Sequence, residues 1–216
     1  EFNWISHKME NIIVGITGAS GVVYGQRLLQ ALSDKSYSVH LSVSEAALQV
    51  IESELNLTLN LDDFNISKFI DRENHSITYH HISDIAASIS SGTLKTRAMI
   101  IAPCSMNTLC SIANGIASNL IQRAASVTLK EGRKLVVMPR ETPLTPIHLE
   151  NMLKLSRAQT CILPAMPGYY YHPKTIDDQI DFMVGKALDY IGVEYPPYTR
   201  ESYGDWKYMS SEFMSS

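Results

Sequence analysis

The chain has 216 residues, of which 45% are hydrophobic and 19% are charged, so it can fill one core and is short for two. Its formal net charge is −4 and its basic residues are scattered, which argues against nucleic acid or an anionic membrane as the main partner. Three cysteines, Cys104, Cys110 and Cys161, lack C-x-x-C spacing, so neither a disulfide framework nor a zinc site is expected.

The first ten residues, which include "EFNWISHK" before Met9, read as a leftover of expression cloning or as a frayed native end. They hold no signal-peptide core, and the longest apolar runs are only as long as a strand. We therefore expect no membrane-spanning segment. Together with the cysteine pattern, this favours a reducing cytoplasm.

Apolar runs alternate with amphipathic stretches along the chain: "NIIVGIT", "VHLSVS", "AMIIAPC", "KLVVMP" and "TCILPAMP". This alternation predicts an α/β fold, a parallel sheet with helices on both faces, in a single domain over residues 11–192. "HSITYHH" is a candidate further strand, and residues 193–216, with Trp206, are expected to form a tail docked on a neighbouring subunit. Ligands of such sheets bind at the carboxyl ends of the strands.

The first loop, "GITGASG", places Gly15, Gly18 and Gly21 between a strand and a helix without matching the dinucleotide or P-loop fingerprints. The glycines allow close backbone approach, the helix start offers N–H groups to an anion, and Ser20 adds a hydroxyl. An alternative is that the glycines only form a tight turn. No acidic residue suited to grip a ribose follows the second strand, which ends at Ser44, so a mononucleotide such as FMN is favoured over NAD.

Glu54 falls on the apolar face of the helix predicted in "SEAALQVIESEL", together with Ala47, Val50 and Ile51. A carboxylate in an apolar stripe must be paired, protonated or functional, so Glu54 is the first acid/base candidate. The alternative is that it leaves the stripe at the helix end or meets a cation.

Two groups of charged residues are candidates for phosphate binding. Arg123 and Lys130 lie seven residues apart on one helix, hence on one face and about 10 Å apart, although a solvated face is the commoner explanation for such a pair. Arg140 and Glu141 follow an apolar strand between prolines, a rigid place from which a guanidinium can bind phosphate.

The acidic run "DDQID" resembles a magnesium-binding cluster, but Thr175 and Asp178 have the spacing of a capping box, so no metal is predicted. His148 is expected to be a hydrogen-bonded structural histidine. The "GYYYHP" run follows a strand, and at least one of its tyrosines is expected at the site.

Taken together, "GITGASG", "APCSMNTL", "NLIQRAA", "LKEGRKLVVMPRETPL", "IHLENML", "PAMPGYYYHP" and "TIDDQIDFMVGKALD" resemble the UbiX-type flavin prenyltransferases, over residues 11–192. The resemblance implies a Rossmann-type, flavodoxin-like fold that joins a dimethylallyl group from dimethylallyl phosphate to N5 and C6 of reduced FMN. FMN is then a substrate, and the prenylated product serves a UbiD-type decarboxylase. The family also implies a homododecamer with sites at subunit interfaces, and no metal.

The resemblance also implies roles for individual residues. Flavin contacts match the loop residues and the residues that follow the second and third predicted strands: Gly18, Ala19, Ser20, Ser44, Ser105, Met106, Thr108 and Arg123. Glu54 matches a glutamate linked with proton transfer, and Ser20, Lys130 and Glu141 complete the expected catalytic set. Four residues match the surroundings of the donor phosphate: Lys130, Arg140, Tyr170 and Lys186.

The chain departs from the family at Lys186, where relatives commonly have Arg. Lysine keeps the positive charge but cannot make the two parallel hydrogen bonds of a guanidinium. It also has Glu45 where many relatives have Lys, at a position predicted to face solvent. Two other functions stay open: an FMN-dependent decarboxylase of the cysteine-peptide kind, and a non-catalytic flavin-binding or delivery protein. The expected catalytic histidine of the first is absent after Gly21, and intact Glu54, Lys130 and Arg140 argue against the second.

Overall fold

A computed structural model describes residues 9–33 and 35–198. The chain forms two compact units, Glu1–Ala165 and Met166–Ser216. The first unit carries the sheet, and the second carries the last helix. Trp206 and the rest of the expected tail beyond residue 198, as well as residues 1–8, lie outside the described residues.

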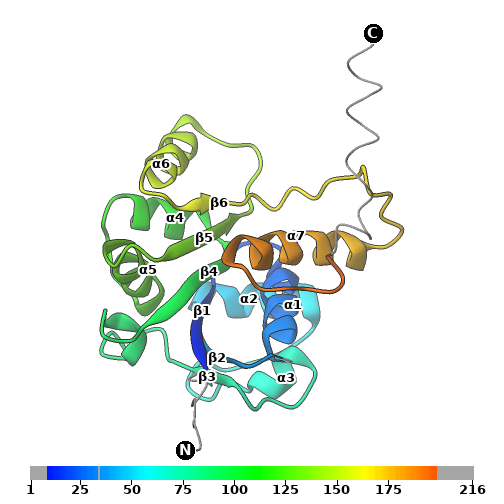
Figure 1. The fold of residues 1–216 in the computed structure, drawn as a ribbon, viewed down its shortest axis with the longest axis horizontal. Coiled ribbons are helices and arrows are strands. Elements are labelled where there is room, and N and C mark those ends of the chain that lie inside the picture. Colours follow the sequence, from blue (N-terminus) through cyan, green and yellow to red (C-terminus); the bar gives the residue numbers. More distant parts are fainter. Residues whose placement is uncertain (1–8, 34, 199–216) are drawn as a thin grey trace, which may run out of the picture. The chain divides into compact units, whose positions relative to one another are not determined.

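The first unit is built on one parallel sheet, so the predicted α/β, Rossmann-type fold is confirmed (Figure 1). Its strands run in the order β3-β2-β1-β4-β5-β6, and the order therefore reverses between β1 and β4. The strands are β1 (Glu10–Ile16), β2 (Tyr37–Val43), β3 (Ile77–Tyr79), β4 (Thr96–Cys104), β5 (Lys134–Pro139) and β6 (Cys161–Ile162). The candidate strand in "HSITYHH" is β3, whereas only two residues of "TCILPAMP" pair as β6.

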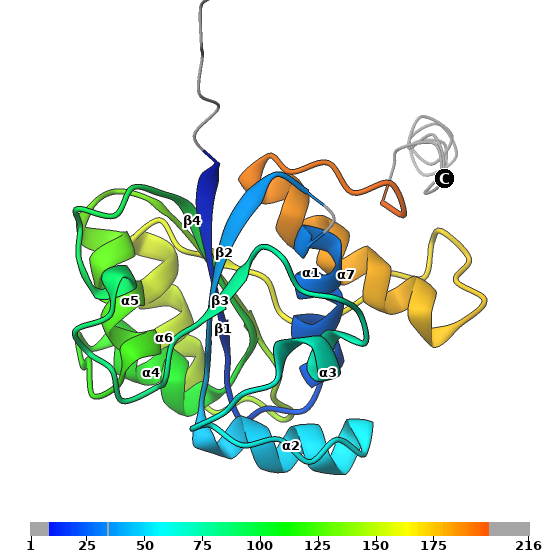
Figure 2. The same ribbon diagram turned by 90° about the horizontal axis from the view of Figure 1, so that it is seen from below.

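Helices cover both faces of this sheet, as predicted. In Figure 2, α4, α5 and α6 lie on one face, α1 and α3 on the other, and α2 lies beyond the carboxyl end of β2. The helices are α1 (Val22–Ser33), α2 (Glu45–Leu55), α3 (Ile66–Ile70), α4 (Met106–Ala113), α5 (Leu120–Lys130) and α6 (Pro146–Arg157). A 3₁₀ turn, η1 (Ser88–Ser90), precedes β4.

The core explains the near-continuous apolar strands. Side chains on one face of β1, β4 and β5 pack against α4, α5 and α6; this cluster includes Ile13, Met99, Ile101, Leu135 and Val137. On the opposite face, Leu28, Leu29 and Leu32 of α1 are buried. Each fully buried leucine contributes about 1.5–3 kcal/mol relative to an exposed one, so a strand covered on both faces gains from apolar residues at every position.

The helix starts follow local signals in the sequence. Ser44 caps α2 by accepting a hydrogen bond from the Ala47 N–H, and Pro146 occupies the first turn of α6. His148 accepts a hydrogen bond from the Thr145 N–H at 3.3 Å, which confirms it as a hydrogen-bonded structural residue of that capping box. The first two features were also predicted, because side-chain caps and N-terminal proline satisfy or avoid the unpaired N–H groups of a helix start.

The second unit consists of an aromatic cluster around α7 (Ile176–Ile191). The rings of Tyr171 and Phe182 stack with centroids 4.7 Å apart, and Tyr170 meets Phe182 edge to face at 5.9 Å. The predicted capping box is present: Thr175 accepts from the Asp178 N–H, and Asp178 accepts from the Thr175 N–H at 3.0 Å. Hydrogen bonds from the backbone lower the pKa of the Asp178 carboxyl, as expected for an acid at a helix start.

Candidate functional site

The carboxyl ends of β1, β2 and β4 bring three helix starts to the place where the strand order reverses. Ser44 caps α2 directly after β2, and Ser105 caps α4 directly after β4. Thr17 joins the ends of β1 and β4: its hydroxyl donates to the Pro103 carbonyl at 3.0 Å and accepts from the Ser105 N–H at 2.7 Å. Crevices at such switch points are the usual ligand sites of open α/β sheets.

The first loop is shaped by close contacts within the protein. A Cβ on Gly18 would collide with the Ala46 side chain and lie 3.1 Å from the Ala46 carbonyl carbon, so only glycine lets the loop rest on α2. Gly21 has φ +97°, a left-handed conformation that favours glycine, immediately before α1. Ala19 is buried between them and Ser20 is exposed. The tight-turn interpretation thus accounts for Gly18 and Gly21.

Glu54 supplies the anion at the start of α1. Its carboxylate accepts hydrogen bonds from the Gly21 N–H at 2.9 and 3.1 Å and from the Val22 N–H at 3.2 Å. The side chain is exposed, so its expected place within a buried stripe is wrong: one turn beyond buried Ile51, α2 leaves the core and ends at Leu55. The partner of this carboxylate is the positive end of a helix, which favours an anion.

The start of α4 lies at the end of β4, on the other side of the position where the strand order reverses. The Ser105 hydroxyl donates to the Thr108 hydroxyl at 3.1 Å and accepts from the Thr108 N–H at 3.3 Å. Met106 and Thr108 are buried, with 6% and 7% of their surface exposed, whereas Ser105 is half-buried. Ser105 is therefore the more accessible of the two hydroxyl residues, and it adjoins the buried side chains of Met106 and Thr108.

Arg140 and Glu141 follow the end of β5 at the same edge of the sheet. Both side chains are exposed, and the Glu141 carboxylate accepts a hydrogen bond from the Thr142 N–H at 3.0 Å. The sequence thus brings Ser20, Ser44, Glu54, Ser105 and this pair to one edge.

Lys130 lies at the opposite edge. It is the last residue of α5, and β5 begins at Lys134, paired with Ala98 near the start of β4. A parallel sheet whose strands span six or seven residues separates its two edges by roughly 20 Å, more than a lysine side chain can cross. Arg123 is exposed on the same helix, two turns earlier. One chain therefore does not bring Lys130 to the carboxyl edge.

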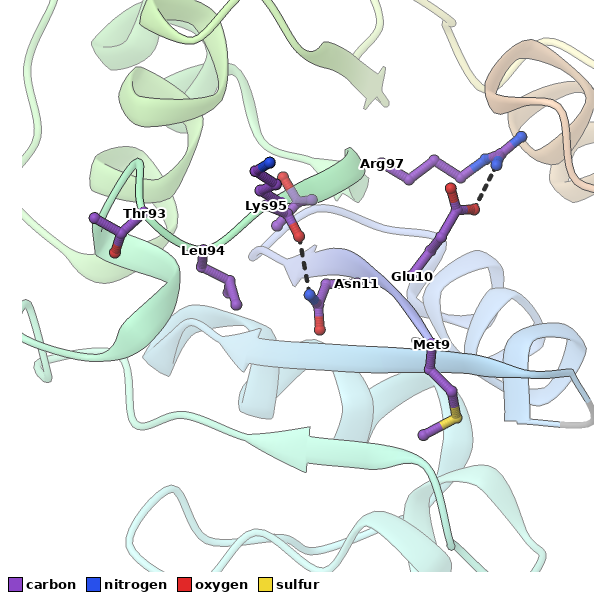
Figure 3. Close-up of a pocket in the computed structure, with 8 residues that line it drawn as sticks. Met9, Glu10, Asn11, Thr93, Leu94, Lys95 and Arg97 are labelled. Atoms are coloured by element: carbon purple, nitrogen blue, oxygen red, sulfur yellow. Dashed lines mark hydrogen bonds and ion pairs between the residues drawn. The ribbon is translucent and has the colours of Figure 1, made fainter. Parts of the chain in front are cut away.

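A cavity of about 370 Å³ opens at this amino edge (Figure 3). Glu10 forms an ion pair with Arg97, and Asn11 donates to the Lys95 carbonyl at 2.9 Å. This cavity was not predicted from the sequence. Its lining comes from the starts of β1 and β4: Met9, Glu10, Asn11, Thr93, Leu94, Lys95, Thr96 and Arg97.

Tyr170 and Lys186 belong to the second unit. Tyr170 is 45% exposed, and the Lys186 ammonium lies 5.3 Å from the Phe182 ring centroid and 5.9 Å from that of Tyr198. Such contacts with aromatic faces stabilise a cation and leave its outer side for an anion. The aromatic contacts of Lys186 were not predicted.

Within residues 9–33 and 35–198, no group of three or more His, Cys, Asp or Glu side chains is arranged to hold a metal ion. The helices of that same range include none long and apolar enough to cross a membrane.

Comparison with known proteins places the chain in a family. The Flavoprotein family model matches residues 5–188. The flavin prenyltransferase UbiX of Halalkalibacterium halodurans is 52% identical over 187 residues, which cover 87% of this chain and 91% of the relative.

Two solved structures are similar over most of their length. One, described as a dodecameric FMN-dependent UbiX-like decarboxylase from Escherichia coli O157:H7, is 45% identical with a TM-score of 0.77 and covers 88% of this chain and 98% of its own. AnUbiX (PadA1), solved with FMN and dimethylallyl pyrophosphate, is 37% identical with a TM-score of 0.81 and covers 92% and 100%. The sheet order and these relatives together show that the chain belongs to the UbiX-type flavin prenyltransferases, within the Flavoprotein family.

Proposed function

We propose that this chain joins the dimethylallyl group of dimethylallyl phosphate to N5 and C6 of reduced FMN, and that the prenylated product serves a UbiD-type decarboxylase. The observation that carries the proposal is the exposed Glu54 carboxylate, which accepts three hydrogen bonds from the Gly21 and Val22 N–H groups at the start of α1. A titratable group held there is available to move a proton on a ligand seated between β1 and β4.

The residues at the carboxyl edge fit a flavin. The starts of α2 and α4 present the Ser44 and Ser105 hydroxyls, and buried Met106 and Thr108 give the adjoining surface an apolar character. The close packing of Gly18 on Ala46 holds the loop backbone against α2. We assign flavin contacts to this set and to Gly18, Ala19, Ser20 and Arg123.

Departure of a phosphate from an allylic carbon requires that the developing negative charge be held by preorganised cations. We assign this role to Arg140, Lys130 and Lys186, and we also assign Tyr170 to the donor-phosphate site and Glu141 to the catalytic set. The aromatic cluster of the second unit suits an allylic cation, because aromatic faces stabilise positive charge in a dry pocket.

Lys130 joins such a site only from another copy of the chain, because it lies at the opposite edge of the sheet from Glu54 and Arg140. We therefore propose a homo-oligomer with sites shared between copies. A dodecamer is the proposed size, by analogy with the relative described as dodecameric. The proposed compartment is the cytoplasm, which suits the free thiols of Cys104, Cys110 and Cys161.

Mass spectrometry of the flavin tests the proposed reaction. Reduced FMN incubated with the protein and dimethylallyl phosphate should gain one prenyl unit, with EDTA present or absent. Dimethylallyl diphosphate in a parallel reaction identifies the preferred donor. Loss of activity in EDTA would contradict the metal-free reaction, and an unchanged flavin mass with both donors would contradict prenyl transfer. Carbon dioxide release from a cysteine peptide by this protein alone would favour the FMN-dependent decarboxylase instead.

A further inference from the structure

The end of α5 is turned by a glycine so that two charged side chains reach a neighbouring loop. Gly132 has φ +63°, its N–H donates to the Leu129 carbonyl at 3.0 Å, and the Arg133 N–H donates to the Thr128 carbonyl at 2.9 Å. Such a left-handed residue ends the helix and satisfies its last carbonyls. Glu131 and Arg133, on either side of it, then face residues 92–96.

Arg133 holds that loop by its backbone. One guanidinium nitrogen donates to the Gly92 carbonyl at 2.7 Å, and the other donates to the Leu94 carbonyl at 2.6 Å and to the Thr96 hydroxyl at 3.4 Å. The Arg133 side chain is only 17% exposed. A rigid, charge-assisted fork of this kind fixes the loop against the end of α5.

The Glu131 carboxylate rests directly on Gly92. A Cβ on Gly92 would lie 2.7 Å from the Glu131 Cδ and would collide with its Oε1, so the glycine leaves the space that the carboxylate occupies. The Lys130 ammonium lies 3.3 Å from Glu131 Oε1, and the Arg133 guanidinium lies 3.9 Å from Oε2. Glu131 thus lies between the largely buried Arg133 guanidinium and the exposed Lys130 ammonium.

We propose that Glu131 is a positioning residue for Lys130, and that Gly92 and Arg133 form the seat that fixes the Glu131 carboxylate. This inference rests on the proposed function, in which Lys130 binds the donor phosphate. Lys130 is 60% exposed and its stem is flexible, so without a partner its ammonium samples many positions. Fixing it beforehand lowers the ordering cost of binding the phosphate.

Gly92→Ala and Glu131→Ala test the proposal by different routes. In Gly92→Ala, the new methyl displaces the free end of a flexible side chain, so the fold should persist while the carboxylate moves. Each variant should raise the KM for dimethylallyl phosphate roughly three- to tenfold, as expected for loss of a partly exposed ion pair that orients a phosphate-binding group. Affinity for FMN and the thermal midpoint should stay unchanged.

Controls separate positioning from charge and from fold. Because both substitutions act on one carboxylate, the double variant Gly92→Ala/Glu131→Ala should be no worse than either single variant. Glu150→Ala, which removes an exposed glutamate of α6, should leave the KM for the donor unchanged. An unchanged or lowered KM in Glu131→Ala, or additive effects in the double variant, would overturn the proposal.

The acylation rate of the Lys130 amine, followed by peptide mass spectrometry with exposed Lys174 as internal reference, does not depend on turnover. It should rise several-fold in both single variants, because the ammonium loses its partner. If the wild type makes no prenylated flavin while the acylation rates respond, the proposed function fails and the Glu131–Lys130 link stands. Unchanged acylation rates would overturn that link.

Discussion

At the scale of single residues, Glu54 accepts three backbone hydrogen bonds and still faces solvent. That Glu54 lies in a helix with Ala47 and Ile51 was predictable from their spacing, although the exposure of its side chain was not. Its partners were not, because Gly21 lies 33 residues earlier and only the packing of α2 beside α1 brings them together. A periodic pattern indicates a direction from a helix axis and cannot indicate which backbone groups lie there.

Glu54→Gln tests whether the carboxylate moves a proton. The amide keeps the shape and one acceptor but cannot titrate, so turnover should fall roughly 10²- to 10⁴-fold while FMN still binds. Single-turnover kinetics of flavin prenylation, with FMN affinity measured alongside, check this. Turnover equal to that of the wild type would reduce Glu54 to a cap on α1.

A second residue-scale feature is a histidine pair next to the amino edge. Asn11 donates its amide to the Lys95 carbonyl, so its oxygen accepts from His40 Nε2 at 3.2 Å. The other nitrogen of His40 then accepts from His80 Nε2 at 2.9 Å. Burial lowers the pKa of both histidines; the neighbouring His80 lowers that of His40 further, and Asp84 partly offsets the effect for His80.

This pair should make stability depend on pH. In the unfolded chain the two histidines titrate near their ordinary pKa of 6.5, while in the fold they stay neutral to lower pH. The unfolded state therefore binds more protons in that window, and stability should fall as pH drops below about 6.5.

His80→Gln, which keeps a donor toward His40, should flatten this dependence by roughly 3 °C in thermal midpoint between pH 7 and pH 5. Matched scans of His75→Gln, a change at an exposed histidine, provide the control. Equal slopes for both variants and the wild type would exclude the pair as the source.

At the scale of elements, the loop between β1 and α1 depends on contact between Gly18 and Ala46 of α2. Gly18→Ala should therefore destabilise the fold by about 1–3 kcal/mol, because the backbone must shift, and should weaken FMN binding. Chemical denaturation and FMN titration measure both effects. Ala46→Gly in the same chain should recover part of the loss, and no recovery would assign the effect to the loop's own backbone.

Helix α7 carries Lys186 against two aromatic rings. Lys186→Ala should raise the KM for dimethylallyl phosphate far more than it weakens FMN binding, because an ammonium neutralises a phosphate oxygen. Lys186→Arg should stay active, with a similar or lower KM if its fork fits the phosphate. Donor kinetics at saturating reduced FMN check both variants. Unchanged kinetics in Lys186→Ala would exclude the residue from the pocket.

Most elements were predictable because their signals are local. The apolar runs matched β1, β2, β4 and β5, and the starts of α2, α6 and α7 followed from Ser44, Pro146 and Thr175. The length of β6 was not predictable, because an apolar run does not show how many of its residues pair with a neighbouring strand. Only Cys161 and Ile162 pair with β5. Pairing is a property of the sheet and is absent from the segment.

At the scale of the whole molecule, the proposed site needs two copies, and complementation tests this. Lys130→Met and Glu54→Gln should each retain little activity alone, because each removes one half of every shared site. When the two variants are co-expressed or dissociated and reassembled together, mixed sites that combine an intact Lys130 with an intact Glu54 should recover a substantial fraction of activity. The measurement is the activity of the mixed sample. As a control, each variant is dissociated and reassembled alone, and neither should regain activity. No recovery in verified mixed oligomers would confine the site to one chain.

The placement of Lys130 could not be predicted from helical spacing. The sequence correctly put it on the same face of one helix as Arg123, but the end of that helix relative to the sheet follows from chain direction: α5 leads into β5 and therefore ends where β5 begins. Residues that follow strands share one edge, and residues that precede strands share the other. A list of charged residues does not distinguish these cases.

Because Lys130 and Glu54 lie at opposite edges of the sheet, the effect of a mutation depends on how many altered and normal chains a cell makes. Under the proposed arrangement, a change at Lys130, Glu131 or Gly92 alters a site whose other residues, among them Glu54, belong to a neighbouring copy of the chain. A cell that makes both an altered and a normal chain would assemble a graded mixture of working and idle sites, in proportions set by random mixing.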